Sequence, residues 1–238
     1  HIKLIDEYYI RIVLDKIKND VKYKIRIHNE KKHYSNLLKQ QKSSDTIQKI
    51  EPTVPAFTYA YKLYYPFLLE HMPNYNYAEY LQNLIKSKNQ KINALSLGSG
   101  TGDWEIKLVE DFNDIISMEL IDINKDLLNV SKNYADKHNL DIITTEADIN
   151  KIKLESNKYD LIVVRSSLHH FLELEHIFEQ INSSLKPDGN FVVIGEVIGK
   201  NGEQIFPETE KMVQQIFSTL PEKFRYNHYT KQIDQKIP

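Results

Sequence analysis

Short apolar runs alternate with longer amphipathic stretches along the sequence between residues 90 and 200. The apolar runs have the length of buried strands and occur near 92–97, 115–121, 139–145, 159–165 and 190–195. Between them, apolar residues recur every three or four positions, the period of a helix, near 103–111, 124–138 and 171–185. This alternation predicts an α/β fold with a doubly wound, mostly parallel sheet and helices on both faces. Ligands bind such sheets at the carboxyl ends of the strands.

The ends of several elements carry local signals. Asn124 is a predicted N-cap of the second helix, and Lys-Pro-Asp-Gly at residues 186–189 predicts a turn before the last strand. A further helix is predicted from Pro207 to Leu220, and the remaining residues have no clean period.

The residues before the sheet predict a separate region. We expect a mainly helical cap over residues 1–88 and a ligand-binding domain over residues 89–238, with a helix near 77–86 leading into the first strand. Residues 40–45 contain few apolar side chains and are the best candidate for a linker.

The first part of the cap contains two patterns. Residues 2–19 place their apolar side chains on one side of a helix, as a packing helix does. Residues 21–27, Val-Lys-Tyr-Lys-Ile-Arg-Ile, alternate instead, which favours a strand. No turn signal separates the two patterns, so a continuing helix stays open as the alternative.

Tyrosine is concentrated in the second part of the cap. Seven of the fifteen tyrosines lie between residues 57 and 80. One interpretation is an aromatic lid that shapes a ligand pocket. The other is that the rings pack the cap against the sheet while their hydroxyl groups reach solvent.

Composition narrows the class of protein. The 238 residues are 41% hydrophobic and 27% charged, as in globular proteins, and the absence of cysteine excludes disulfides and thiolate chemistry. No apolar run is long enough to span a membrane and no signal-peptide pattern is present, so a cytoplasmic location is expected. Residues 1–50 hold 12 Lys and Arg against 6 Asp and Glu, although the whole chain has a net charge of −2. This basic start suits either an acidic partner or the acidic remainder of the chain, and it is too diffuse to indicate nucleic acid.

A glycine-rich turn follows the first strand. Three of the seven glycines fall within Gly98-Ser99-Gly100-Thr101-Gly102, where a strand ends and a helix begins. Glycine permits positive φ and lets a ligand approach bare backbone, while the helix N-terminus leaves N–H groups unpaired. The turn therefore predicts a ligand cradle.

The residues around this turn indicate which ligand it holds. The spacing differs from the G-x-G-x-x-G of dinucleotide sites, and Asp103 and Glu105 in the first helical turn would repel a diphosphate. Asp122 ends the second strand, where a carboxylate accepts hydrogen bonds from a ribose diol. The pattern favours an adenosine ligand with a cationic tail.

Five motifs, in order, resemble the class I S-adenosylmethionine-dependent methyltransferases. They are Leu-Ser-Leu-Gly-Ser-Gly-Thr-Gly, Leu-Ile-Asp-Ile-Asn, Glu-Ala-Asp-Ile, Tyr-Asp-Leu-Ile-Val-Val-Arg-Ser-Ser-Leu-His-His-Phe and Leu-Lys-Pro-Asp-Gly-Asn-Phe-Val-Val-Ile, all within residues 90–200. The resemblance implies a Rossmann-like fold and S-adenosylmethionine as methyl donor, with S-adenosylhomocysteine as product. The donor-binding residues that it implies are Gly98, Ser99, Gly100, Thr101, Gly102, Asp103, Asp122, Ile123, Asp148, Ile149, Arg165 and Ser166.

This chain departs from the family pattern at two places. The family usually has an acidic residue two positions before the first glycine, where this chain has Ser96. Asp103 is a candidate replacement. The family also ends its sheet with an antiparallel hairpin, which the sequence after Gly199 does not predict.

His169 and His170, which follow the fourth strand, are the candidate catalytic residues. Imidazole titrates near neutral pH and can remove a proton from a hydroxyl acceptor, with His170 the preferred base. Alternatively, both rings line the pocket and positioning alone accelerates the reaction. The histidines lack the spacing of metal ligands, so no metal is expected.

The resulting hypothesis is methyl transfer from S-adenosylmethionine to an oxygen or nitrogen of a small-molecule or peptide-like acceptor, without nucleic acid. The alternative from another class is a non-catalytic binding or regulatory module with the same fold. A nucleotide-dependent oxidoreductase is disfavoured by the glycine spacing.

Overall fold

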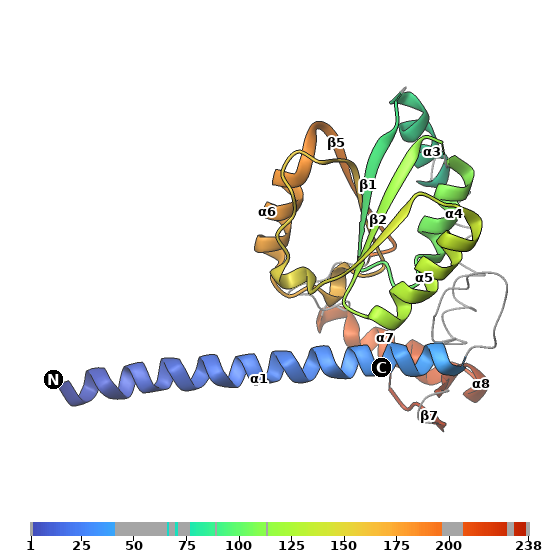
Figure 1. Ribbon diagram of the computed structural model, residues 1–238. Coiled ribbons are helices and arrows are strands. Elements are labelled where there is room, and N and C mark those ends of the chain that lie inside the picture. Colours follow the sequence, from blue (N-terminus) through green and yellow to red (C-terminus); the bar gives the residue numbers. More distant parts are fainter. Residues whose placement is uncertain are drawn as a thin grey trace.

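A computed structural model describes residues 2–40, 66, 70, 77–88, 90–112, 114–196, 207–227 and 231–236. Its centre is a five-stranded sheet with the order β3-β2-β1-β4-β5, and every pair in it is parallel (Figure 1). The strands are β1 (Ile92–Leu97), β2 (Ile116–Asp122), β3 (Ile142–Glu146), β4 (Tyr159–Arg165) and β5 (Leu185–Ile194). The predicted doubly wound α/β fold is confirmed.

Helices connect these strands much as predicted. They are α3 (Tyr77–Ser87), α4 (Asp103–Phe112), α5 (Lys125–His138) and α6 (Leu174–Ser184), with 3₁₀ turns η1 (Ile149–Lys151) and η2 (Leu168–His170). The predicted N-cap is confirmed, because the Asn124 side chain accepts a hydrogen bond from the Asp126 N–H. At the other end of α5, Asn139 adopts a left-handed conformation with φ of 53°.

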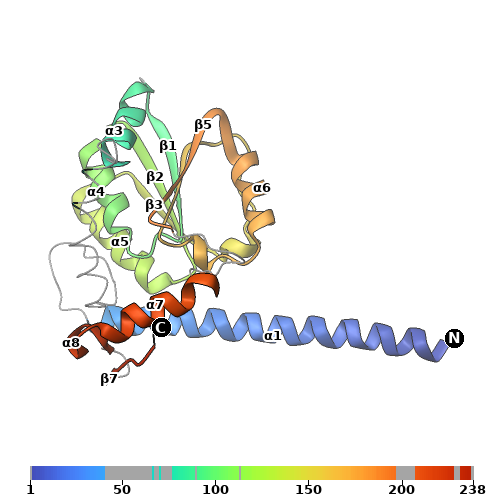
Figure 2. The ribbon, with the colours of Figure 1, turned by 180° about the vertical axis from the view of Figure 1, so that it is seen from behind.

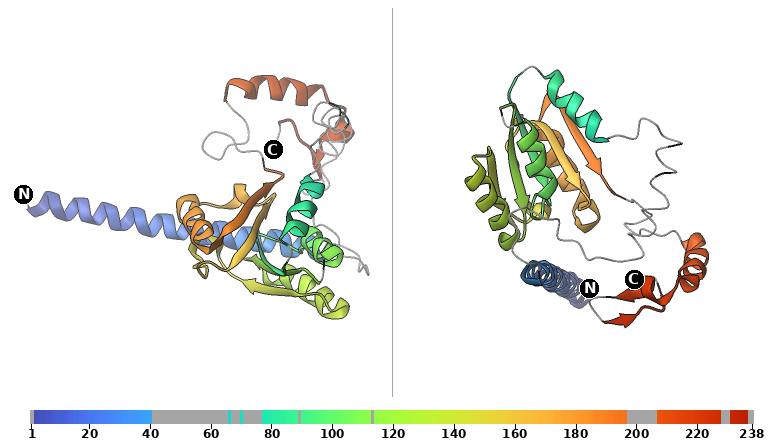
Figure 3. Two further views of the ribbon diagram at one scale, coloured as in Figure 1. Left: turned by 90° about the horizontal axis from the view of Figure 1, so that it is seen from above. Right: turned by 90° about the vertical axis from the view of Figure 1, so that its right-hand side faces the viewer.

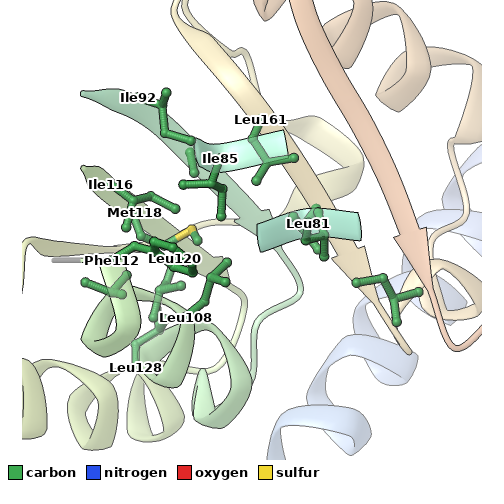
Figure 4. Close-up of a cluster of buried hydrophobic side chains, with 14 residues drawn as sticks. Leu81, Ile85, Ile92, Leu108, Phe112, Ile116, Met118, Leu120, Leu128 and Leu161 are labelled. Atoms are coloured by element: carbon green, nitrogen blue, oxygen red, sulfur yellow. The ribbon is translucent and has the colours of Figure 1, made fainter. Parts of the chain in front are cut away.

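The two faces of the sheet form two cores because side chains alternate along each strand. Ile92 and Ala94 of β1 join the core covered by α3, α4 and α5, which Figure 4 shows. Leu95 and Leu97 of the same strand join the core covered by η1, η2 and α6. Both faces of β1 are therefore buried, as expected for a central parallel strand.

The strand order reverses direction at β1. The chain proceeds from β1 to β2 and β3 on one side, and returns to β4 and β5 on the other. The crevice at the carboxyl ends of β1 and β4 is therefore the topological switch point, where open α/β sheets bind ligands.

The N-terminal region contains one long helix, α1 (Ile2–Gln40). The strand predicted at residues 21–27 is wrong, and the continuing helix is what forms. Half-buried Tyr23 and Ile27 lie one turn apart on the side of α1 toward the sheet domain, while exposed Val21 and Ile25 lie one turn apart on another side. Two helical pairs offset by two residues therefore produce the alternation of a strand.

Helix α1 crosses below the carboxyl edge of the sheet, and its N-terminal half extends beyond the rest of the chain (Figures 1 and 2). The linker predicted at residues 40–45 lies outside the described residues except for Gln40. The tyrosine-rich segment up to residue 76 does as well, apart from Pro66 and Glu70. The division at residue 88 stays a prediction.

The C-terminal part differs from the prediction in detail. The predicted helix is α7 (Pro207–Thr219), followed by α8 (Glu222–Arg225) and a small antiparallel pair, β6 (Tyr226–Asn227) and β7 (Gln232–Ile233), which forms a separate sheet (Figure 3). The residues predicted as a turn, 186–189, belong to β5, where the pairing with β4 shifts register between Tyr159 and Leu161. In the described ranges, no helix is both long and apolar enough to cross a bilayer.

Candidate functional site

A cavity of about 310 Å³ lies at the switch point and is walled on its remaining side by α1. All of the predicted site residues line it except Gly102. They are Gly98, Ser99, Gly100, Thr101, Asp103, Asp122, Ile123, Asp148, Ile149, Arg165, Ser166, His169 and His170. Residues from four separate loops are thus brought together, because the carboxyl ends of parallel strands share one edge.

Two glycines of the turn illustrate different constraints. Gly100 has φ of +60°, and a Cβ on it would meet no atom within 4 Å, so a side chain there would project into open space at the cavity wall. Gly102 has φ of +62°, but its Cβ would lie 2.7 Å from Leu120 Cδ1, inside the core. Gly100 therefore keeps the cradle open, whereas Gly102 permits close packing of α4 against the sheet.

Asp122 holds the turn from the end of β2. Its Oδ2 accepts from the Gly100 N–H at 2.9 Å, and its Oδ1 accepts from the Asn124 N–H at 2.7 Å. Burial raises the pKa of Asp122, and these backbone hydrogen bonds oppose that shift. The carboxylate has about four lone pairs, so acceptor capacity remains for a ligand in the cavity.

Helix α1 provides a wall that the sequence did not predict. Ile27, Glu30, Lys31 and Tyr34 line the cavity although they lie more than sixty positions before the glycine turn.

Polar contacts attach α1 to the loops around the cavity. The Tyr23 hydroxyl donates to Asp148, the Ser35 hydroxyl donates to Asp126 at 2.7 Å, and Lys31 Nζ lies 3.1 Å from Glu146 Oε1. These contacts hold the wall to the loops that follow β2 and β3.

Two buried polar contacts support the base of the turn. Arg165 Nη2 lies 2.6 Å from Asp103 Oδ1. These two residues, both predicted to bind the methyl donor, therefore form a partly buried ion pair with each other. The Ser96 hydroxyl donates to Glu105 Oε1 at 2.9 Å, and Glu105 is only 1% exposed. Burial raises the pKa of Glu105, which Arg165 opposes. Asp103 is thus engaged by Arg165, while the carboxyl group that contacts Ser96 belongs to Glu105.

The two histidines have different carboxylate neighbours. His169 Nδ1 lies 2.9 Å from Oε2 of Glu196, whose side chain is 3% exposed and whose other oxygen accepts from the Leu168 N–H at 2.7 Å. His170 Nδ1 lies 3.3 Å from Glu30 Oε1 on α1. Glu196 follows β5 and belongs to no motif, so the sequence contained no local signal for it.

His170 is held neutral. Burial, together with the neighbouring His169 and Arg26, lowers the pKa of His170 to about 4. Its ring centroid lies 4.2 Å from that of His169. At neutral pH His170 is therefore an uncharged ring and a weak base, whereas the better-oriented imidazole is that of His169.

Comparison with known proteins identifies the family of this chain. Residues 88–236 match the family described as methyltransferase domain. The chain is 28% identical over 138 residues to malonyl-[acyl-carrier protein] O-methyltransferase 2 of Ilyobacter polytropus, covering 58% of this chain and 49% of that protein. It is 25% identical over 113 residues to the ubiquinone/menaquinone biosynthesis C-methyltransferase UbiE of Brucella suis, covering 47% and 42%. The chain therefore spans about half the length of these curated relatives.

Solved structures also match, at lower identity. The PH0226 protein of Pyrococcus horikoshii matches with a TM-score of 0.39 at 22% identity, over 58% of this chain and 57% of that one. Phosphoethanolamine N-methyltransferase 2 of Haemonchus contortus, in complex with S-adenosyl-L-methionine, matches with a TM-score of 0.43 at 19% identity, over 53% and 29%.

Proposed function

This chain belongs to the class I S-adenosylmethionine-dependent methyltransferases, and we propose that it transfers a methyl group from S-adenosylmethionine to an oxygen or nitrogen of a small-molecule or peptide-like acceptor. The observation that carries the proposal is the cavity beside Gly100, which Asp122 lines from the end of the neighbouring strand.

The residues of the cavity fit this donor. A side chain at position 100 would project into the cradle, so bare backbone faces the ligand there. Asp122 would accept hydrogen bonds from the ribose, and Ile149 would provide an apolar surface beside Asp148 for the adenine. The Gly-x-Gly-x-Gly spacing of the turn also differs from the G-x-G-x-x-G of dinucleotide sites.

The bound donor would supply an electrophilic methyl group, so the protein needs to position the acceptor and, for a hydroxyl acceptor, to remove its proton. Glu196 orients His169 through Nδ1, which leaves Nε2 to accept that proton. His170 and Glu30 line the same cavity and restrict the acceptor. We therefore place the general base at His169 rather than at His170, which the sequence had favoured.

Titration calorimetry tests the donor assignment directly. We expect S-adenosylmethionine and S-adenosylhomocysteine to bind to the full chain and NAD not to bind, because the glycine spacing of the turn differs from that of dinucleotide sites. Affinity for NAD without affinity for the sulfonium compound would contradict the proposal. A screen of metabolites with methyl-labelled donor then identifies the acceptor, and donor binding without any transfer would support a non-catalytic module.

A second prediction concerns the ribose. Replacing Asp122 by alanine should weaken donor binding by roughly ten- to a hundredfold, since a charge-assisted hydrogen-bond pair contributes about 1.5–3 kcal/mol. Asp122→Asn should have a smaller effect, because the amide oxygen still accepts one hydrogen bond. Calorimetry on the three proteins measures the difference, and equal affinities would place the ribose elsewhere.

A further inference from the structure

We propose that the outward face of α1 docks on an anionic lipid bilayer. Tyr23, Ile27, Glu30 and Tyr34 are half-buried on the side of α1 toward the sheet domain. A second row, with the three- and four-residue spacing of one helix face, is exposed on the opposite side. We call it the outward stripe, and it consists of Lys18, Val21, Lys22, Ile25, Asn29 and Lys32.

Most of the positive charge of α1 forms no ion pair with the sheet domain in the described residues. Residues 18–40 contain seven Lys and Arg (18, 22, 24, 26, 31, 32 and 39) against two acidic residues (20 and 30). Lys31 forms an ion pair with Glu146 of the sheet domain. In the part of the chain that the structure describes, no ion pair to that domain involves a lysine of the outward stripe. Among the described residues, Lys31 is the only one of these seven that forms an ion pair with the acidic remainder of the chain. This favours an external acidic partner for the basic start.

The chemistry of the outward stripe fits an anionic bilayer. Val21 and Ile25 are 50% and 54% exposed and lie between Lys18, Lys22 and Lys32. Aliphatic side chains flanked by lysines are the pattern of interfacial helices, which insert the former among acyl chains and pair the latter with anionic headgroups. The stripe contains no aromatic or arginine anchor of the kind that dominates protein interfaces. It also lacks arginine, whose guanidinium group binds a nucleic-acid phosphate through two hydrogen bonds.

The shape of the helix fits the same partner. The outward stripe runs for about 21 Å along a continuous helix, at 1.5 Å per residue. The cavity lies on the inner side of the same helix, where Ile27 and Glu30 line it. Docking would hold the cavity about one helix diameter, roughly 10 Å, from the headgroups.

Co-sedimentation of the full chain with phosphatidylcholine vesicles, with and without phosphatidylserine, tests the proposal. We expect binding only to the vesicles that contain phosphatidylserine, and weaker binding at high salt because counterions screen the lysines. The variant K18E/K22E/K32E should lose at least about tenfold in binding, given the contribution of each lysine near an anionic surface. V21S/I25S should also bind more weakly, which separates insertion from charge attraction alone.

The variant K107E/K132E/K153E is the matched control, since it reverses three exposed lysines that do not belong to α1. It should bind the anionic vesicles as the unchanged protein does, and all variants should keep the circular dichroism spectrum. Failure of the unchanged protein to bind anionic vesicles would overturn the proposal. So would an equal loss in the control variant. Preferential binding to DNA or to an acidic protein over these vesicles would assign the stripe to that partner instead. None of these outcomes depends on methyl transfer.

Discussion

Replacement of Gly100 by valine is expected to abolish S-adenosylmethionine binding. Gly100 has φ of +60°, a conformation that costs an L-residue roughly 1–2 kcal/mol and is least favourable for a β-branched side chain. The new side chain would also project into the cradle, because Gly100 lines the cavity and a Cβ at this position would meet no protein atom within 4 Å. Calorimetry with the donor, beside thermal unfolding, measures the two effects separately.

Gly100→Asn is the control that separates strain from obstruction. Asparagine tolerates the left-handed conformation better than other side chains, so this variant should unfold near the temperature of the unchanged protein. It should nevertheless lose donor binding, since its side chain occupies the same space. If the valine variant folds and binds the donor normally, the glycine turn is not the cradle.

The sheet and the glycine turn were predictable because their signals are local. Each strand is a short apolar run, and the turn depends on glycines whose conformation is set within five residues. The N-cap at Asn124 was predictable for the same reason, since its bond to the Asp126 N–H spans two positions.

The conformation of residues 21–27 was not predictable from their alternation. Tyr23 and Ile27 pack toward the sheet domain, whereas Val21 and Ile25 face away from it. A strand with one buried face and a helix with apolar side chains on two faces give the same pattern over seven residues. Tertiary contacts, such as that of Tyr23 with Asp148, distinguish them.

The remaining walls of the site depend on contacts between distant positions. Glu30 reaches His170 across 140 positions, and Glu196 reaches His169 across 27. The contact between Ser96 and Glu105 was not predicted either, although only nine positions separate the two residues. Ser96 departs from the family pattern and Asp103 was the candidate replacement, but the fold places the buried carboxyl group of Glu105 against that serine.

Replacement of His169 by glutamine should lower kcat by about 10²–10⁴-fold for a hydroxyl acceptor, the usual contribution of a general base. Donor affinity should be kept, because the change removes the proton acceptor and preserves much of the side-chain volume. Glu196→Gln should also lower kcat, since an amide no longer stabilises an imidazolium and no longer fixes the tautomer of His169. Steady-state kinetics with the identified acceptor, together with donor calorimetry, measures each value.

His170→Gln is the matched control at the adjacent residue. The pH profile of the rate shows which of the two histidines is the general base. A histidine base is active only in its unprotonated form, so a rate that depends on such a base rises with pH. His170 has a pKa lowered to about 4 and is already uncharged near neutral pH. Its replacement should therefore raise the KM of the acceptor and leave the pH dependence in place, whereas His169→Gln should remove it. If neither variant changes kcat or the pH profile, histidine has no part in proton transfer, and positioning of the acceptor by the cavity accounts for the rate.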